Sequence, residues 1–209
     1  SSTSRGLGDV YKRQLLGSGK ALPITTLEKV ISKIPESKMP HHKLISTSKE
    51  DRLRHTRGQS LSDWFSMHSG AIECFTDGVA FPKSSDEVKE LLLFASENNI
   101  NVIPYGGGTS VVGHINPEPH GKLNLTISMA NMTKLLDLDP ISLLARFQPG
   151  ANGPQIENQL NEEGFTLGHF PQSWEYSTLG GWIASRSSGQ QSLRYGRIEN
   201  LFAGGKIIT

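Results

Sequence analysis

The residues best suited to chemistry in this sequence form a glycine-rich run that ends in two hydroxyl residues. The run is Pro104-Tyr105-Gly106-Gly107-Gly108-Thr109-Ser110, and it follows a short apolar stretch, Asn101–Ile103, that predicts a β-strand. Glycine adopts backbone conformations that a Cβ atom forbids, so consecutive glycines can turn several N–H groups toward one point. Such a concave set of donors suits an anion, most often phosphate. A flexible connector is the simpler alternative, and the glycines alone do not decide between the two.

A second segment with similar residue types lies further along the chain. Its hydroxyl and glycine residues are Ser173, Ser177, Thr178, Gly180 and Gly181. The apolar residues that follow predict a helix, and a helix N-terminus beside hydroxyls and glycines is a second candidate anion site. Further donors come after it: Ser185, Arg186, Ser187 and Ser188. A capped helix with a polar loop would explain one such segment, but two segments in one domain fit a ligand with two phosphates better.

The composition limits the classes of partner. The 209 residues are 35% hydrophobic and 20% charged, which is typical of a globular protein. A net charge near +1 gives no electrostatic reason to expect nucleic acid or an anionic membrane as partner. The single cysteine, Cys74, excludes an intrachain disulfide and a cysteine-rich metal site. The adjacent His41 and His42 point in different directions on any regular element, so no metal site is expected.

The chain is expected to divide into three regions. Residues 1–50 form a leader and a short helix, which falls within Leu22–Ile34. The first part, Ser1–Lys20, is expected to be disordered and lacks the apolar core of a secretory signal, so cytoplasm is the default location. No apolar run approaches the roughly 20 residues that a membrane-spanning helix needs. Residues 51–71 form a helical lead-in segment, and residues 72–209 form the main body.

The lead-in segment combines basic and apolar residues. We interpret its basic residues as a solvated surface: Arg52, Arg54, His55 and Arg57. Its apolar residues have helical spacing and predict a short helix packed on the main body: Leu61, Trp64, Phe65 and Met67.

The main body begins with a strand, a helix and a second strand. Val79–Pro82 predicts the end of the first strand, and Ser84 with Glu87 has the spacing of a capping box at the start of the helix. The helix presents one apolar face: Val88, Leu91, Leu92 and Ala95. Such a unit pairs its two strands in parallel. The glycine run then lies at the carboxyl end of a parallel strand, where open α/β sheets bind ligands.

The pattern changes after the glycine run. Leu123–Ser128 alternates apolar and polar residues, which predicts a strand with one buried face. Leu135–Leu138 and Leu143–Phe147 predict an antiparallel pair, and Gly150–Gly164 contains a further helix. The sequence therefore predicts an α+β fold with a small parallel α/β subdomain and an antiparallel-sheet subdomain.

Three motifs together resemble a known superfamily. They are PYGGGTSV at Pro104–Val111, GHFPQSWEYSTLGGW at Gly168–Trp182 and SRSSGQQSLRYGRIENL at Ser185–Leu201. They resemble the FAD-binding half of the vanillyl-alcohol-oxidase-type flavoproteins, which have the PCMH-type FAD-binding fold. Within this superfamily they are most similar to the alkyldihydroxyacetonephosphate synthase family. DRLRHTRGQSL at Asp51–Leu61 also resembles the segment that precedes the flavin domain there.

The resemblance implies a set of residues that bind FAD. They are Pro104, Tyr105, Gly106, Gly107, Gly108, Thr109, Ser110, Gln172, Ser173, Trp174, Glu175, Tyr176, Ser177, Thr178, Gly180, Gly181, Ser185, Arg186, Ser187 and Ser188. Some flavoproteins of this group tether FAD through a histidine near the glycine loop. Here Thr109 and Ser110 follow the glycines directly and His114 lies beyond them, so noncovalent FAD is expected. A valine at Gly107 is expected to resist a positive φ and to fill the phosphate site.

The resemblance implies two alternative reactions. One is the exchange of an acyl for an alkyl group on acyl-dihydroxyacetone phosphate in ether-lipid synthesis; the other is FAD-dependent oxidation of a 2-hydroxy acid such as D-lactate or glycolate. A nucleotide-binding module without chemistry is a third alternative. In the family, a cap domain that binds the small-molecule or lipid substrate follows the FAD-binding region. We therefore expect a C-terminally truncated chain, inactive alone, with no catalytic residue.

His169 is the one titratable residue beside a cofactor motif. Its type alone does not make it catalytic, and a structural histidine bonded to backbone is the preferred interpretation. A homodimer is a further expectation.

Overall fold

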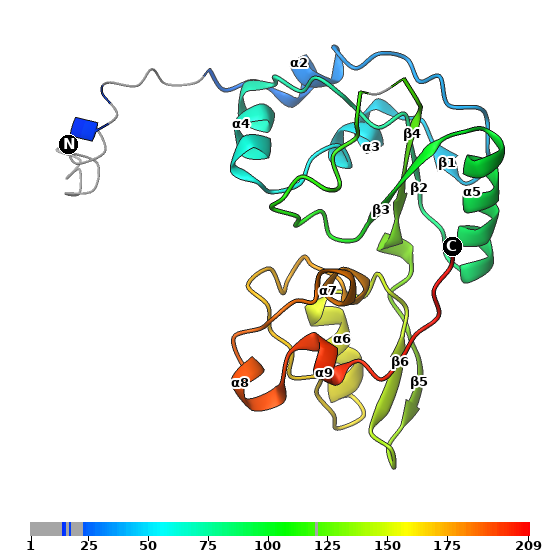
Figure 1. Ribbon diagram of the computed structural model, residues 1–209, viewed down its shortest axis with the longest axis vertical. Helices are drawn as coiled ribbons and strands as arrows, with labels where there is room; N and C mark the ends of the chain where they lie inside the picture. Colours follow the sequence, from blue (N-terminus) through cyan, green and yellow to red (C-terminus); the bar gives the residue numbers. More distant parts are fainter. Residues whose placement is uncertain (1–13, 16, 18–22, 120) are drawn as a thin grey trace.

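The structure is a computed structural model that describes residues 14–15, 17, 23–119 and 121–209. The predicted leader, Ser1–Lys20, thus lies almost entirely outside the described residues. The described elements form two groups, one above the other in Figure 1. In the part of the chain that the structure describes, no helix is long and apolar enough to cross a membrane.

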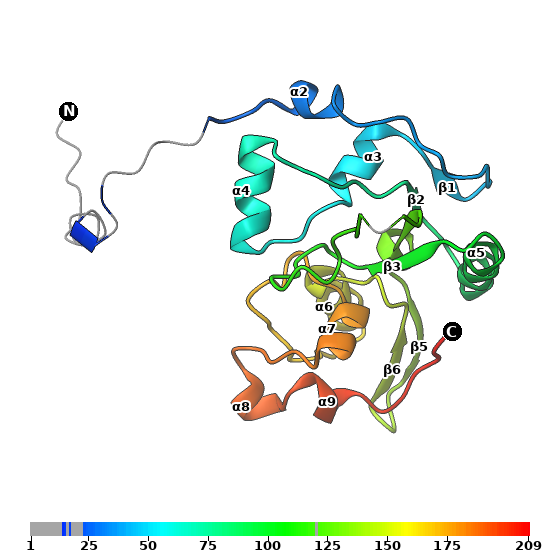
Figure 2. The same cartoon turned by 45° about the horizontal axis from the view of Figure 1, so that its top comes forward.

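The first group contains a four-stranded sheet with helices around it. Its elements are α2 (Leu27–Ile31), β1 (Ile45–Ser46), α3 (Lys49–Arg54), α4 (Leu61–Ser69), β2 (Gly78–Ala80), α5 (Ser85–Glu97), β3 (Asn101–Tyr105), β4 (Asn124–Ser128) and the 3-10 helix η1 (Met129–Asn131). The strand order is β1-β2-β4-β3. Strands β2, β4 and β3 are parallel and β1 is antiparallel to β2. In Figures 1 and 2, α4 lies at one side of this group and α5 at the other.

The predicted strand–helix–strand unit is present, but its two strands are not neighbours. Strand β4 lies between β2 and β3, so β3 pairs with β4 instead of β2. The register sets Tyr105 opposite Ser128. The glycine run that follows β3 therefore begins beside the carboxyl end of β4.

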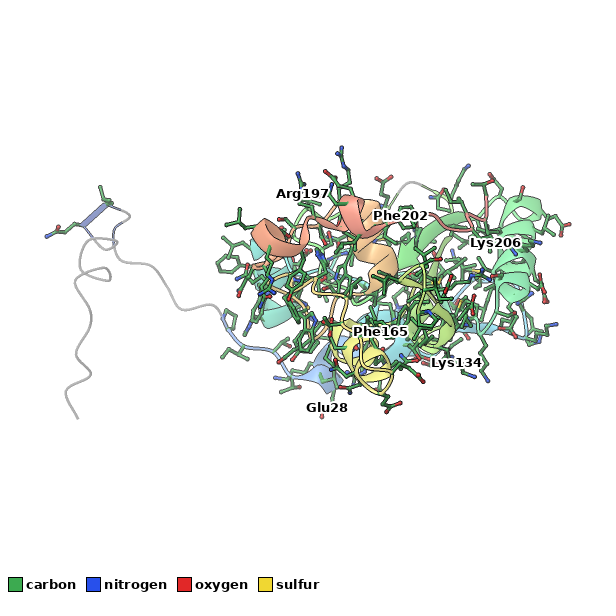
Figure 3. All side chains as sticks on the ribbon, turned by 90° about the horizontal axis from the view of Figure 1, so that it is seen from below. Glu28, Lys134, Phe165, Arg197, Phe202 and Lys206 are labelled. Atoms are coloured by element: carbon green, nitrogen blue, oxygen red, sulfur yellow. The ribbon has the colours of Figure 1, made fainter. Side chains whose placement is uncertain are left out.

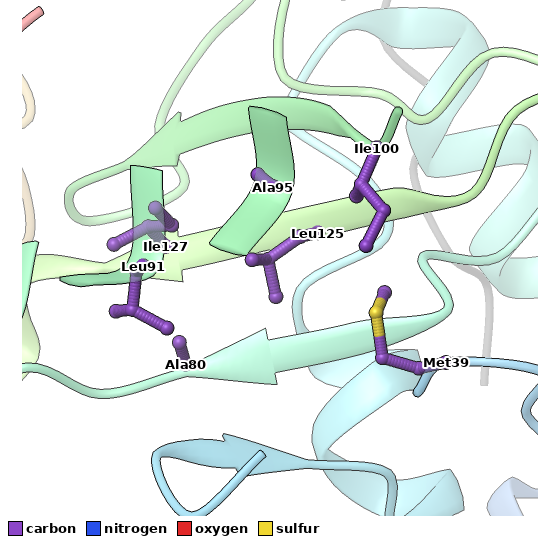
Figure 4. Close-up of a cluster of buried hydrophobic side chains, with 7 residues drawn as sticks. All are labelled: Met39, Ala80, Leu91, Ala95, Ile100, Leu125 and Ile127. Atoms are coloured by element: carbon purple, nitrogen blue, oxygen red, sulfur yellow. The ribbon is translucent and has the colours of Figure 1, made fainter. Parts of the chain in front are cut away.

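The main core lies where α5 packs on the sheet. Figure 4 shows its buried side chains: Met39, Ala80, Leu91, Ala95, Ile100, Leu125 and Ile127. The expectation that Leu123–Ser128 has one buried face is wrong, because all five residues of β4 are buried. A central strand is covered on both faces, and the buried side chains of Asn124 and Thr126 are hydrogen-bonded. The Thr126 hydroxyl, for example, donates to the Thr76 hydroxyl at 3.0 Å.

Two predictions made from the sequence for the lead-in segment are wrong. Arg52 was assigned to a solvated surface, but it is 1% exposed and donates to the carbonyl oxygens of Thr76 and Pro35 at 2.8 and 2.7 Å. The apolar residues of α4 were expected to pack on the main body, but Leu61 and Phe65 are 75% and 51% exposed. The residue that α4 buries is polar, Asp63.

The second group combines a hairpin with four helices. Its elements are β5 (Leu135–Asp139), β6 (Leu144–Phe147), α6 (Gly153–Asn161), α7 (Leu179–Ser185), α8 (Ser192–Tyr195) and α9 (Ile198–Leu201). The strands β5 and β6 are antiparallel, as predicted. The buried core of this group is Ala151, Ile156, Leu160, Trp182 and Ile198. The segment after α9, where Phe202 and Lys206 are labelled in Figure 3, extends towards α5.

Candidate cofactor-binding site

The glycine loop folds over the side chain of Tyr105. Gly108 has a φ of +69°, and a Cβ atom there would lie 2.7 Å from the Tyr105 ring carbon that carries the hydroxyl. The Tyr105 ring lies 4.7 Å from the His55 ring, and its hydroxyl donates to the Arg54 carbonyl at 3.3 Å. Burial raises the pKa of Tyr105, so its phenol is neutral at physiological pH. The positive φ that was expected at Gly107 therefore occurs at Gly108.

The glycine loop packs directly against the second predicted segment. A Cβ atom on Gly107 would lie 2.6 Å from the Tyr176 carbonyl carbon and closer still to its oxygen, and one on Gly106 would meet the Thr178 hydroxyl. Figures 1 and 2 show the loop after β3 between α4 and α7. The fold thus brings together two segments that are far apart in the sequence. The glycines are required here because the other backbone occupies the space of a side chain.

The segment before α7 uses several of its side chains to hold its own shape. The Ser177 hydroxyl donates to the Ser173 carbonyl at 2.8 Å and accepts from Trp182 Nε1 at 2.7 Å. The Asn152 side chain donates to the Glu175 carbonyl at 3.1 Å. Three predicted residues have exposed side chains: Gln172, Glu175 and Tyr176. This segment is therefore a preformed turn.

Two backbone amides at the N-terminus of α7 are bonded to protein acceptors. The Leu179 N–H donates to the Ala151 carbonyl at 2.9 Å, and the Gly180 N–H donates to the Pro149 carbonyl at 2.8 Å. These two N–H groups are therefore not free for an anion, whereas the Thr178 hydroxyl at the same helix end is unpaired within the described part of the chain. The physical reason is that Pro149 and Ala151 approach the first turn closely: a Cβ atom on Gly180 would lie 2.8 Å from Pro149 Cβ.

The third predicted segment makes its contacts within the second group. The Ser185 hydroxyl donates to the Gly181 carbonyl at 2.8 Å, and Arg186 Nε donates to Glu199 at 2.9 Å. The Ser187 hydroxyl lies 2.6 Å from His169 Nε2. Ser188 is exposed. These side chains do not contact the glycine loop.

His169 lies behind the second segment. It is 1% exposed, its ring meets Trp182 edge-on, and its partner is the Ser187 hydroxyl, where a backbone group was expected. Burial lowers the pKa of His169, so the ring is neutral near pH 7. His169 Nδ1 is buried and has no hydrogen-bond partner within the described part of the chain, and the contacts of the ring, Trp182 and Ser187, lie outside the glycine loop.

Comparison with known proteins identifies the family. Residues 76–209 match the FAD binding domain family. The chain belongs to the FAD-binding domain family. It is 40% identical over 158 residues to the alkyldihydroxyacetonephosphate synthase of Dictyostelium discoideum, an alignment that covers 76% of this chain and 26% of the relative. The synthase of Caenorhabditis elegans is 41% identical over 160 residues, which cover 75% of this chain and 27% of the relative.

A solved structure supports the same relationship for the FAD-binding domain. One structure of alkyldihydroxyacetonephosphate synthase superposes with a TM-score of 0.80 at 33% identity, covering 92% of this chain and 38% of that chain. The glycolate oxidase subunit GlcD of Bacillus subtilis is more distant, at 29% identity over 132 residues that cover 63% of this chain and 27% of the relative. These findings confirm the fold and the flavoprotein resemblance predicted from the motifs. The chain spans about a quarter of the length of the curated relatives it matches.

The residues at the carboxyl edge of the sheet fit an FAD-binding domain. Two hydroxyl oxygens there, Ser128 Oγ and Thr178 Oγ1, are buried and have no hydrogen-bond partner within the described part of the chain. Among the described residues, no acceptor reaches the backbone N–H groups of Gly107, Gly108 and Thr109. Leaving the two buried hydroxyls unpaired is costly unless a ligand or water satisfies them, whereas Gly107 is exposed. A phosphate-bearing cofactor supplies oxygen acceptors of the kind that these donors need.

Sequence reasoning missed Ser128 as a candidate site residue. The alternation of β4 assigned Ser128 to an exposed face of an isolated strand. Only the strand order sets its hydroxyl beside the start of the glycine loop. Its position at the end of a strand was the one signal in the sequence that could have marked it.

Proposed function

We propose that this chain is the FAD-binding part of a flavoenzyme that makes alkyldihydroxyacetone phosphate by exchanging the acyl group of acyl-dihydroxyacetone phosphate for an alkyl group. The observation that carries the proposal is the close packing of Gly106 and Gly107 on Tyr176–Thr178, in a chain that is 40% identical to such a synthase. Both segments belong to motifs that resemble this family.

The N–H groups of Gly107, Gly108 and Thr109 would hold the FAD pyrophosphate, with Thr178 Oγ1 as a further donor. A loop of N–H donors beside a parallel strand stabilises the negative charge of a phosphate. When bound, FAD supplies a ring that exchanges electrons with the substrate. The part of this chain is to bind the cofactor, to orient it through two rigid segments and to exclude water from its phosphates.

The proposal includes noncovalent binding of FAD. The Ser110 hydroxyl lies 3.2 Å from His114 Nδ1, which ties this exposed histidine to the end of the loop. After denaturation of the reconstituted protein in acid, all flavin should stay in the supernatant. Flavin in the precipitated protein would refute noncovalent binding and would direct attention to His114.

Oxidation of a 2-hydroxy acid is the second candidate function, favoured by the similarity to a glycolate oxidase subunit. The assay uses the full product of the gene, because the curated relatives are much longer than this chain. One reaction contains palmitoyl-dihydroxyacetone phosphate and a fatty alcohol, and the other contains D-lactate or glycolate with an electron acceptor. Formation of the alkyl product is expected, and turnover of the hydroxy acid alone would refute the synthase function.

Four further predictions belong to the proposal. Substrate choice is assigned to a cap domain that binds a small molecule or a lipid, and His169 has no catalytic part. A homodimer is expected and light scattering of the full gene product measures its mass. A cytoplasmic location is expected and cell fractionation measures it.

A further inference from the structure

The lead-in segment is bonded to the downstream end of the glycine loop. The Gln59 N–H donates to the Ser110 carbonyl at 2.6 Å. The Gly58 N–H donates to Asn116 Oδ1 at 3.1 Å, and Asn116 Nδ2 donates to Asp63 Oδ1 at 2.7 Å. Residues 58–63 and 110–116 are thus joined by three hydrogen bonds, although they are far apart in the sequence.

Asp63 is the centre of this contact. It is 2% exposed, and its second oxygen, Oδ2, accepts from the Ser60 N–H at 3.1 Å and the Ser60 hydroxyl at 2.6 Å. Burial raises the pKa of Asp63, but the hydrogen bonds from Ser60 and Asn116, with the nearby Arg57 charge, hold it below its ordinary value. Asp63 is therefore an ionised carboxylate that is fixed in one orientation by donors on both oxygens.

The approach of the two segments leaves no room for a side chain at Gly58. A Cβ atom on Gly58 would lie 2.5 Å from the Ser110 carbonyl oxygen and 3.4 Å from Asp63 Oδ2. Between the bonded residues Ser110 and Asn116, Val111 and Val112 are 66% and 76% exposed, whereas Ile115, next to Asn116 in the sequence, is buried at 6% exposure. The first half of this stretch is thus held mainly by the hydrogen bond at Ser110, and its second half by the burial of Ile115 and the hydrogen bonds of Asn116.

The same segment also supports the upstream end of the loop. Tyr105 contacts the Arg54 carbonyl and the His55 ring, both at the end of α3. The glycines therefore lie between two anchors, one through Tyr105 and one through Ser110 and Asn116. Both anchors belong to residues 54–63.

We propose that Asp63, acting through Asn116, is a positioning residue that fixes the glycine loop in the conformation that receives FAD. This inference rests on the proposed role of the loop in holding the cofactor. A loop that is ordered before binding loses less conformational entropy when the ligand arrives, so the contact raises FAD affinity without touching FAD. Asp63, Ser60 and Gly58 lie outside the segments that the sequence motifs assign to the flavin.

Exchanging the side chains of Asp63 and Asn116 tests the positioning role directly. In Asp63→Asn, the oxygen of the new amide faces Ser60, and the NH2 group of residue 63 then meets the NH2 group of Asn116. If the Asn116 amide flips, the NH2 group of Asn116 meets the Gly58 N–H instead, so two donors face each other in either case. In Asn116→Asp, two carboxylates face each other. In the double variant Asp63→Asn/Asn116→Asp, every hydrogen bond finds a donor and an acceptor again. Each single change therefore breaks the contact, and the exchange restores it.

Two quantities are measured for each variant. The first is the Kd for FAD, from quenching of flavin fluorescence well below the unfolding temperature, and the second is the Tm of the FAD-free protein. Each single variant should raise the Kd by about tenfold or more, and the double variant should return it to within about threefold of the parent. Ser84→Ala removes the N-cap hydrogen bond of α5 and is the control, because this bond joins Ser84 to Glu87 and not to the loop: it should lower the Tm and leave the Kd unchanged.

The outcomes separate the two proposals. A parent that binds FAD with single variants of unchanged Kd would overturn the positioning role and leave the proposed function intact. A parent that does not bind FAD would overturn both. A double variant that binds as weakly as the single variants would also overturn the positioning role. If a single variant fails to fold, Asn116→Ala keeps Asp63 bonded to Ser60 and should raise the Kd equally; an unchanged Kd there counts against the role.

Discussion

Gly107→Ala is the substitution that most directly perturbs the junction between the two cofactor segments. The added Cβ atom would lie 2.6 Å from the Tyr176 carbonyl carbon and closer to its oxygen, so one backbone must move. Carbon atoms that are not bonded pack at about 3.5–4.0 Å, so the loop or the turn must shift by about 1 Å or more. Gly107 does not have a positive φ, so the effect is steric and comes from the neighbouring backbone.

The shift determines the expected loss of affinity. Hydrogen bonds weaken steeply outside their usual range, and a movement of this size removes the N–H groups of two or more loop residues from a phosphate. Hydrogen bonds to a charged group contribute about 1.5–3 kcal/mol each, so the loss is about 3–6 kcal/mol. The Kd for FAD should therefore rise by at least about 100-fold.

The assay is titration of the FAD-free protein with FAD, followed by flavin fluorescence. Gly164→Ala is the matched control, because the same added atom would meet nothing within 4 Å, although the φ of +82° carries a backbone cost. That variant should lose some stability and keep the parent Kd. If Gly107→Ala binds FAD as tightly as Gly164→Ala does, the junction is not the cofactor site.

Three other predictions concern buried polar groups. Arg52→Met leaves the Thr76 and Pro35 carbonyls without their donor and should lower the free energy of unfolding in urea by about 2–4 kcal/mol. Arg54 is exposed, so Arg54→Met should lower it by less than about 1 kcal/mol, and equal losses in the two variants would refute the role of Arg52. Thr178→Val removes an unpaired hydroxyl, so the free energy of unfolding should change by less than about 1 kcal/mol while the Kd for FAD rises several-fold. An unchanged Kd would exclude this hydroxyl from the site. Burial lowers the pKa of His169 below its unfolded value, so its contribution to stability is complete above about pH 6.5 and is lost as the pH falls below that value, by up to about 1.4 kcal/mol per pH unit. The Tm of the FAD-free protein should fall between pH 7.5 and 5.5, and His169→Gln should reduce that fall; an equal fall in both proteins would contradict the assignment.

Local sequence patterns predicted correctly those helices and strands that depend mainly on residues close together in the sequence. The helix face with Leu91 and Ala95 and the strand before the glycine loop were correct, because apolar periodicity and the Ser84 cap are local signals. The position of β4 between β2 and β3 was missed, because strand order depends on contacts between distant residues. That single feature accounts for the wrong exposure expected at Ser128.

The candidate site could be predicted only in part for a similar reason. The motifs identified the two segments that meet at Gly107 and Tyr176, but they did not reveal that the Pro149 carbonyl takes the Gly180 amide. Arginine is usually a surface residue, so the residue type of Arg52 predicted exposure. Its burial depends on carbonyl groups of other segments, which the sequence does not reveal. Asp63 gave no signal in the sequence, because its partner Asn116 is distant. The division of the chain at residues 51 and 72 stays a prediction.

The central claim is that the glycine loop and the turn before α7 hold FAD. A crystal structure of the chain reconstituted with FAD tests it most directly. We predict that the pyrophosphate lies within hydrogen-bond reach of the N–H groups of Gly107, Gly108 and Thr109, with Thr178 Oγ1 as a further donor. FAD bound away from this loop, or protein that stays colourless after incubation with FAD and desalting, would contradict the claim.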